Sequence, residues 1–476
     1  MRIPHSINPN TLAEYSPSPE TTDLIGETER QIISEDFQWN KNHCPTLVDL
    51  SIQCIGKNFE KKPLFCELPC EDKDHILEII SPDLPLELAI PIIDDEYYWK
   101  RRYETHFHLI LRRKPSDWKW KTLYLENHIQ KVIEEAQPQY SDEENIGEIL
   151  ELCSPYIRRL VVSQLQAWKP PLTMDKDDIP EVYPLNHINF NPILRKLPDI
   201  VEFDLVFGMN NVTEDYKWNM FEVTVKDCQT LGKALLELRN LRILRIHRSK
   251  VEYKHCQALM QNLIKNRSIV ELDLSNCQIG DKGALCVAKF LQVHPFIKIL
   301  NLSNNLIGKI GAEGLGYTLL LSSCAPLVHL NLRLNPLETE GAMGIMRALV
   351  RCSIPRELSM SGCHFQEDTL IKVGQMLKLN ESLKKLDISN NWFGEEGGEY
   401  LVQAMRINTT LEWLDVRETD ISNVQLQVIK KCLLRNRLGF IGVQDIESEE
   451  KFAENEECEE KILAETIFKK SDDNSK

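Results

Sequence analysis

The sequence has no long apolar run and no regular cysteine spacing, and both absences limit what the protein can be. No stretch of the 476 residues approaches the roughly 20 apolar residues that a membrane-spanning helix needs. The first residues, MRIPHSINPN, contain no hydrophobic stretch of a secretion signal, so we expect no secretory leader. The 14 cysteines are scattered along the chain, which is typical of a reduced, intracellular protein.

Positive charge and phosphate-binding glycine motifs are also scarce. The formal net charge of −16 argues against nucleic acid as the main partner. No G-x-x-x-x-G-K-[ST] loop occurs, and strand-to-helix turns explain the glycines of GDKGA and GKIGAEG. A zinc site could be drawn from Cys66, Cys70, His75, His106 and His108, but their spacing is irregular and no second cysteine pair follows. We therefore expect no metal, no cofactor, no small-molecule substrate and no enzymatic activity.

What the second half does contain is one eleven-residue phrase that returns seven times. The phrase follows the pattern L-x-x-L-x-L-x-x-N/C-x-L, the signature of leucine-rich repeats. Successive copies start 28, 28, 30, 28, 28 and 28 residues apart. The copies are LRILRIHRSKV from Leu241, IVELDLSNCQI from Ile269, IKILNLSNNLI from Ile297, LVHLNLRLNPL from Leu327, PRELSMSGCHF from Pro355, LKKLDISNNWF from Leu383 and LEWLDVRETDI from Leu411.

The spacing within each copy predicts a short strand followed by a helix. Alternate residues of a strand face one side, so Leu272 and Leu274 point together into a core. An Asn or Cys, such as Asn305 or Cys277, stands where the chain turns away and can bond otherwise unpaired backbone groups. Apolar residues three and four apart then give one buried helix face. We expect an α/β leucine-rich-repeat solenoid, similar to ribonuclease inhibitor, with parallel strands on the concave face and helices on the convex one.

The rest of the chain divides by composition. Helical patterns with proline-marked breaks predict a small all-α domain, with helices that start near Thr46, Asp72 and Asp94. Strands are expected near residues 157–162 and 199–207. From Asp445 to the last residue there are 12 acidic and 5 basic residues, a net of −7. The predicted segments are a disordered leader (1–33), a helical domain (34–140), atypical first repeats with a linker and an insertion (141–226), regular repeats (227–440) and an acidic tail (441–476).

Residues that break the repeat pattern on the strand face are the candidate partner-binding residues. Asp, Asn and Ser columns recur in such repeats and are structural, whereas Trp and Arg are common anchors of protein interfaces. A basic group stands at the N-terminal end of the array, one arginine interrupts a serine column, and a Trp with an Arg breaks the pattern at the other end. These candidates are Arg242, Arg245, His247, Arg248, Arg333, Trp413 and Arg417.

A second candidate surface lies in the helical region, where basic and aromatic residues alternate. Residues 100–121 contain eight basic and two acidic residues, a net of +6. Such mixtures bind acidic protein surfaces or nucleic acid. Alternatively, the aromatic residues form a core and the basic residues its solvated rim. In an acidic chain we favour an acidic protein partner, through Lys100, Arg101, Arg102, Arg112 and Arg113.

Three phrases that the repeat does not require resemble one family. SPDLPLELAIPIIDDEYYWKRR (81–102), YKWNMFEVTVKDCQTLGKAL (216–235) and RILRIHRSKVE (242–252) are similar to the T-complex-associated testis-expressed protein 1 family, dynein regulatory complex subunit 5. The resemblance implies a non-enzymatic subunit of the nexin–dynein regulatory complex in the axoneme of motile cilia and sperm flagella. It implies cytoskeletal partners: other subunits of the complex, and also doublet microtubules or dynein arms.

A second function class also fits the repeats. GTPase-activating proteins for the small GTPase Ran share repeats of this type and an acidic C-terminal segment. In that reading, Arg245 or Arg333 would act on the nucleotide. The large helical region and the three phrases favour the structural subunit.

Overall fold

The computed structural model describes residues 46–63, 65, 68–107, 119–136, 143–165, 187–208, 222–321 and 324–438. The chain forms two compact units, residues 1–124 and 125–476, which are described separately below. The division falls inside helix α7 (Trp120–Glu135) and not at residue 140. The later part of α7 packs with the repeats because Glu126 and Glu134 accept backbone hydrogen bonds from Arg159 and Ser163, at 2.8 and 2.7 Å. Within the described ranges, no helix has the length and apolarity needed to cross a membrane.

The first unit consists of short helices: α3 (Leu47–Lys57), α4 (Cys70–Ile79), α5 (Leu86–Ile92), α6 (Glu96–Phe107) and the start of α7. Thr46 caps α3 as predicted, because its hydroxyl accepts from the backbone NH of Asp49 at 3.1 Å. Two predicted starts were slightly wrong. Helix α4 begins at Cys70, before Asp72, and the carboxylate at the start of α6 is that of Asp95, which accepts from the NH of Tyr98 at 2.8 Å.

Aromatic side chains form the core of this unit. Tyr98, Trp99, Tyr103 and Tyr124 are at most 2% exposed. Burial of an indole leaves its NH without water, and the Nε1 of Trp99 instead donates to the carbonyl of Ile93 at 2.9 Å. Of the aromatic residues that interleave with basic ones in the sequence, Trp99 and Tyr103 are therefore core residues.

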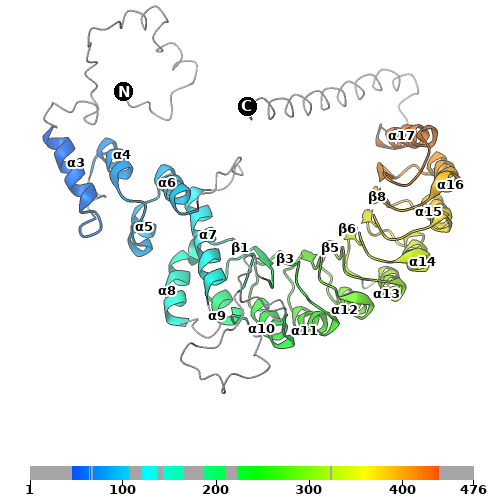
Figure 1. The fold of residues 1–476 in the computed structure, drawn as a ribbon, viewed down its shortest axis with the longest axis horizontal. Helices are drawn as coiled ribbons and strands as arrows, with labels where there is room; N and C mark the ends of the chain where they lie inside the picture. Colours follow the sequence, from blue (N-terminus) through cyan, green and yellow to red (C-terminus); the bar gives the residue numbers. More distant parts are fainter. Residues whose placement is uncertain are drawn as a thin grey trace, which may run out of the picture. The chain divides into compact units, whose positions relative to one another are not determined.

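The second unit is a repeat array around one parallel sheet (Figure 1). Nine described strands pair in chain order, and the two strands expected ahead of the regular repeats are β1 and β2. The strands are β1 (Arg159–Val162), β2 (Glu202–Leu205), β3 (Ile243–Ile246), β4 (Glu271–Asp273), β5 (Ile299–Asn301), β6 (His329–Asn331), β7 (Glu357–Ser359), β8 (Lys385–Asp387) and β9 (Trp413–Asp415). The helices are α8 (Glu143–Cys153), α9 (Phe190–Arg195), α10 (Val225–Leu235), α11 (Tyr253–Leu263), α12 (Gly280–Val293), α13 (Lys309–Leu319), α14 (Glu338–Leu349), α15 (Glu367–Leu379), α16 (Gly394–Ile407) and α17 (Asn423–Leu438).

The register of the sheet follows from the repeated leucines. Leu272 pairs with Leu300, and Leu358 pairs with Leu386, so strands β3 to β8 bury the same position of the phrase. The helices cover the convex side of the sheet, and the strand face lies on the inside of the curve (Figure 1). The predicted α/β leucine-rich-repeat solenoid is confirmed.

A buried row of Asn and Cys side chains joins neighbouring repeats. Asn335 accepts from the backbone NH of Asn305 at 2.9 Å and donates to the carbonyl of Leu302 at 2.9 Å. In the preceding repeat Asn305 accepts from the NH of Cys277 at 3.0 Å. These groups lie beyond the strand ladder, so the side chains satisfy backbone atoms that the sheet leaves unpaired. The predicted role of this position is confirmed.

Candidate partner-binding site on the strand face

Two columns of outward side chains line the strand face, and the pairing register fixes their members. Strands β6 to β9, with Arg333, border a groove of about 360 Å³. The column predicted from the sequence is Arg245, Asp273, Asn301, Asn331, Ser359, Asp387 and Asp415. The second column is Ile243, Glu271, Ile299, His329, Glu357, Lys385 and Trp413.

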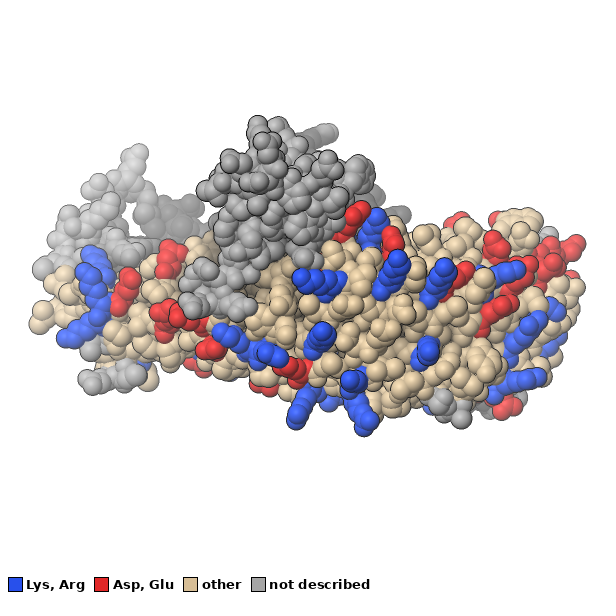
Figure 2. Space-filling model, turned by 90° about the horizontal axis from the view of Figure 1, so that it is seen from below, with Lys and Arg blue, Asp and Glu red and all other residues tan. Residues whose placement is uncertain are grey.

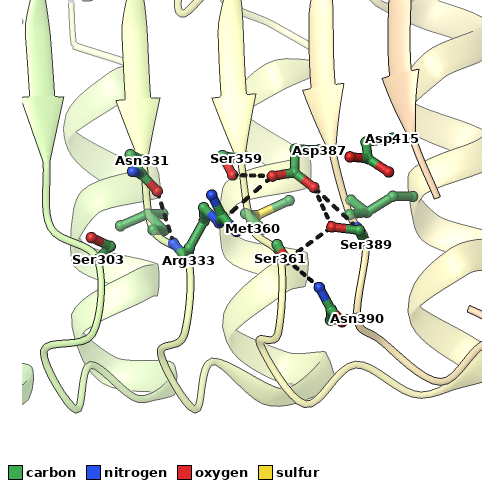
Figure 3. Close-up of polar contacts among 12 residues, drawn as sticks. Ser303, Asn331, Arg333, Ser359, Met360, Ser361, Asp387, Ser389, Asn390 and Asp415 are labelled. Carbon is green, nitrogen blue, oxygen red and sulfur yellow. Dashed lines mark hydrogen bonds and ion pairs between the residues drawn. The ribbon is translucent and has the colours of Figure 1, made fainter. Parts of the chain in front are cut away.

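Asp387, at the end of β8, is the centre of the polar contacts in the groove (Figure 3). Its two carboxylate oxygens accept from the hydroxyls of Ser359 and Ser389, each at 2.7 Å. The Nε of Arg333 lies 3.8 Å from the same carboxylate. Arg333 follows β6 and reaches past β7 towards Asp387 on β8, and its side chain remains half exposed. It can therefore make further hydrogen bonds with a partner.

In the second column, Glu357 on β7 contacts a side chain on each of its two neighbouring strands. It accepts from His329 on β6 at 3.0 Å and from Lys385 on β8 at 2.9 Å. The hydrogen bond from His329 is the main reason that the pKa of Glu357 lies below its usual value, and Lys385 lowers it further. These contacts hold the charged groups in place before a partner arrives, which reduces the ordering cost of binding.

Trp413 forms the rim of the groove at β9. It is 39% exposed and stands beside Lys385 in the sheet. Arg417 lies at the same edge, and its guanidinium donates to both oxygens of Asp415, from Nε to Oδ1 at 3.0 Å and from Nη2 to Oδ2 at 2.6 Å. Burial alone would raise the pKa of Asp415, but the hydrogen bonds from Arg417 lower it overall. An exposed aromatic beside preorganised charges of both signs is the composition of a protein interface.

The four basic residues predicted at the start of the array do not form one surface. The guanidinium of Arg245 lies between Glu202 and Glu271, with Nη2 2.9 Å from Glu271. His247 bonds Asp204 at 2.7 Å. Arg242 precedes β3 and Arg248 follows it, so these two exposed residues stand at opposite ends of the strand. The expectation of a single basic cluster is corrected, because neighbouring strands supply carboxylates to its central members.

In the helical unit, Arg102 is wrong as a partner-binding residue. It is 4% exposed, and its guanidinium lies over the rings of Trp99 and Tyr124. Arg101 donates to backbone carbonyls near the end of α4, and the exposed Lys100 pairs with Glu104 at 3.9 Å. Arg112 and Arg113 lie outside the described residues.

Sequence reasoning missed His329, Glu357 and Lys385. The sequence did contain a signal for them. In the column that ends at Trp413, isoleucine alternates with glutamate in β3, β4 and β5, whereas β6, β7 and β8 carry three ionisable residues in succession. These three residues differ in charge and size, so they form no regular pattern of the kind seen in the column of Asp, Asn and Ser residues. For the zinc alternative, Cys66 and His108 lie outside the described residues, and elsewhere in the described chain no group of three His, Cys, Asp or Glu could hold a metal ion.

The fold defines a leucine-rich-repeat protein. The family model for leucine-rich repeats matches residues 265–288, 293–316, 323–346 and 379–402. Among solved structures, leiomodin-1 actin-binding site 2 is similar with a TM-score of 0.23 at 15% identity, over 50% of this chain and 99% of that chain. A score this low carries no functional meaning.

The chain is similar to dynein regulatory complex subunit 5, as its three phrases predicted. It is 33% identical to that protein from Mus musculus over 240 residues, which is 47% of this chain and 46% of the relative. It is 31% identical to the Homo sapiens protein over 235 residues, with the same coverage. The matches span about half the length of these relatives.

Proposed function

We propose that this chain is a non-enzymatic, structural subunit of a nexin–dynein regulatory complex in the axoneme of motile cilia and flagella. In this role it links doublet microtubules and helps to regulate dynein-driven sliding through protein–protein contacts. The observation that carries the proposal is the similarity to dynein regulatory complex subunit 5. A repeat array suits such a link because each repeat contacts only its neighbours and the array offers a long concave surface.

The strand-face groove supports the same role. Its charged side chains bond one another across β6, β7 and β8, and Trp413 remains available to a partner. Buried Trp anchors contribute a large share of the free energy at protein interfaces. We propose that another subunit of the complex contacts this groove.

Co-sedimentation with salt-stripped, demembranated axonemes tests the function. The full chain is expected to pellet with axonemes and to occur in motile-cilium fractions. Trp413→Ala is expected to weaken the affinity for axonemes by about thirtyfold or more, since loss of a Trp anchor costs about 2 kcal/mol or more. A chain that stays fully in the supernatant, and is absent from cilia, contradicts the proposal.

Trp392 provides a matched control. It is also an exposed Trp, at 64%, but it does not line the groove. Trp392→Ala should pellet like the native chain. Equal losses of axoneme binding for both variants would show that the groove is not the contact site, while the axonemal role itself would stand. The enzymatic alternative is tested by measuring GTP hydrolysis by Ran with and without the native chain. A GTPase-activating protein must raise the rate of hydrolysis, whereas a structural subunit leaves it unchanged.

A further inference from the structure

A second groove lies at the edge of the sheet where the chain enters its strands. It has a volume of about 750 Å³ and is formed by the segments that lead from helices α10, α11 and α12 into strands β3, β4 and β5. Five exposed basic side chains line it, and its lining residues contain no Asp or Glu. The five are Arg239, Arg242, Lys265, Arg267 and Lys298.

These five cations form no ion pair with any carboxylate in the described parts of the chain. The acidic residues beside the groove already have other partners. Glu237 is bound by Arg195 at 3.0 Å, and Asp199 is bound by Arg158 at 3.3 Å. On the strand face, by contrast, Arg245 contacts two glutamates. Like charges that share a groove repel one another, so this arrangement costs free energy in the absence of an anionic ligand.

The groove also offers apolar surface. Val201, Leu236 and Val270 contribute to its walls, and Phe296 is 41% exposed at its edge. The ring of Phe296 meets that of the buried His294 edge to face, at 5.9 Å between centroids. This contact holds Phe296 in one place. A ligand that matches the groove must therefore carry several negative charges and an apolar group.

Two classes of polyanion could match the charge, and the rest of the chain favours one of them. A nucleic acid presents a long, even row of phosphates and needs an extended basic track. The basic lining ends after Lys298, since the equivalent residue of the next repeat is Val328. Figure 2 shows Lys and Arg across the middle of the helical side, but with Asp and Glu among them. The net charge of −16 further disfavours nucleic acid.

We propose that this groove binds an acidic polypeptide segment of a partner protein. Several Asp or Glu carboxylates of the segment pair with the five cations, and one apolar side chain of the segment packs on Phe296. The site is separate from the strand-face groove, because the two share no lining residue. It does not depend on the axonemal role.

The test is fluorescence anisotropy of a labelled peptide of about ten glutamates and one leucine, titrated with the full chain at low and at raised salt. The native chain is expected to bind, with an affinity that falls as salt is added. Arg239→Glu with Arg267→Glu is expected to weaken binding by about tenfold or more, because each exposed ion pair is turned into a repulsion. The milder pair Arg239→Gln with Arg267→Gln should give a smaller loss, and circular dichroism shows whether both variants fold.

Lys254→Glu with Lys289→Glu is the matched control. Both lysines are exposed on the neighbouring helices α11 and α12, do not line the groove, and give the same change of net charge. This control should bind the peptide within about twofold of the native chain.

Three results would overturn the proposal. Equal binding by the groove variant and the control would show that only net charge matters. Tighter binding of a labelled oligothymidine than of the peptide would assign the groove to nucleic acid. If the peptide binds only after residues 445–476 are removed, the groove is occupied by the chain's own acidic segment, which carries 12 acidic residues.

Discussion

His294 occupies a buried position at which asparagine recurs in other repeats. Asn266 precedes it by 28 residues, and Asn408 holds the same place further on. Asn408 donates to the carbonyl of Leu377 and accepts from the NH of Leu411, both at 2.8 Å. Both ring nitrogens of His294 have no hydrogen-bond partner of normal geometry among the described residues, although the ring is 1% exposed.

His294→Asn is therefore expected to stabilise the repeats. The amide can form the bonds seen for Asn408, which should raise the free energy of unfolding by about 1 kcal/mol at neutral pH. Loss of the stacked contact with Phe290 offsets part of the gain. Urea unfolding of the variant and the native chain measures the difference, and a destabilised variant would contradict the prediction.

The same substitution should change the pH dependence. Burial lowers the pKa of His294 below the usual histidine value of 6.5, and nearby backbone carbonyls of Asn266 and His294 offset only part of this. The folded state then binds fewer protons than the unfolded state, so native stability is full above about pH 6.5 and falls as the pH drops towards the folded-state pKa. The advantage of His294→Asn should grow from about pH 7 to about pH 5. An unchanged difference would show that the pKa of His294 is the same in the folded and the unfolded state.

Single residues also mark where sequence reasoning fails. The column containing Arg245 and Asp387 was predicted correctly, because a strand has a fixed period of two and the repeats set the register. The partners of Arg245 could not be predicted in the same way, since they depend on rotamers and on neighbouring strands. Arg102 was misplaced for a similar reason. Its burial depends on how α6 packs against α7, and the helical pattern of one segment does not contain that information.

At the scale of elements, two glycines allow α13 and α14 to approach closely. A Cβ placed on Gly316 would lie 2.5 Å from the carbonyl oxygen of Gly344, which is backbone and cannot move aside. Gly316→Ala should therefore lower the free energy of unfolding by about 1–3 kcal/mol, the usual cost of overpacking. Thermal unfolding followed by circular dichroism measures the effect.

Gly314, on the same helix, is the control for this prediction. Its Cβ would meet only the side-chain end of Leu285, a partly exposed leucine that can change rotamer. Gly314→Ala gains helix propensity of up to about 1 kcal/mol and should be neutral or stabilising. Similar losses in both variants would mean that α13 tolerates no added methyl group and that the contact with Gly344 has no special role.

The existence of the repeated elements was predictable, but the second row of polar side chains was overlooked. Asn266, His294, Asn380 and Asn408 follow the same period as the leucines, so the signal was present in the sequence. It was missed because these residues end the helices, outside the eleven-residue phrase. The basic groove was not predicted for a related reason. Arg239 and Lys265 belong to connecting segments, which the strand columns do not include.

At the scale of the whole molecule, the array should lose stability locally and not all at once. Each strand of the sheet pairs only with its neighbours in chain order. In such an array stability is approximately a sum of repeat terms and nearest-neighbour terms. Asn335 is a suitable site for a test, because its amide accepts from Asn305 and Ile307 and donates to the carbonyls of Leu302 and Leu332.

Asn335→Ala leaves several buried backbone groups unpaired and should cost about 2–4 kcal/mol in the affected repeats. Amide hydrogen exchange followed by mass spectrometry is expected to speed up in β5, β6 and β7, the strands on either side of the change. Exchange in β1 and β2 should stay at native rates, because those strands do not pair with the strands of this repeat. Faster exchange throughout the chain would instead show that both units unfold together, and the nearest-neighbour description would be wrong.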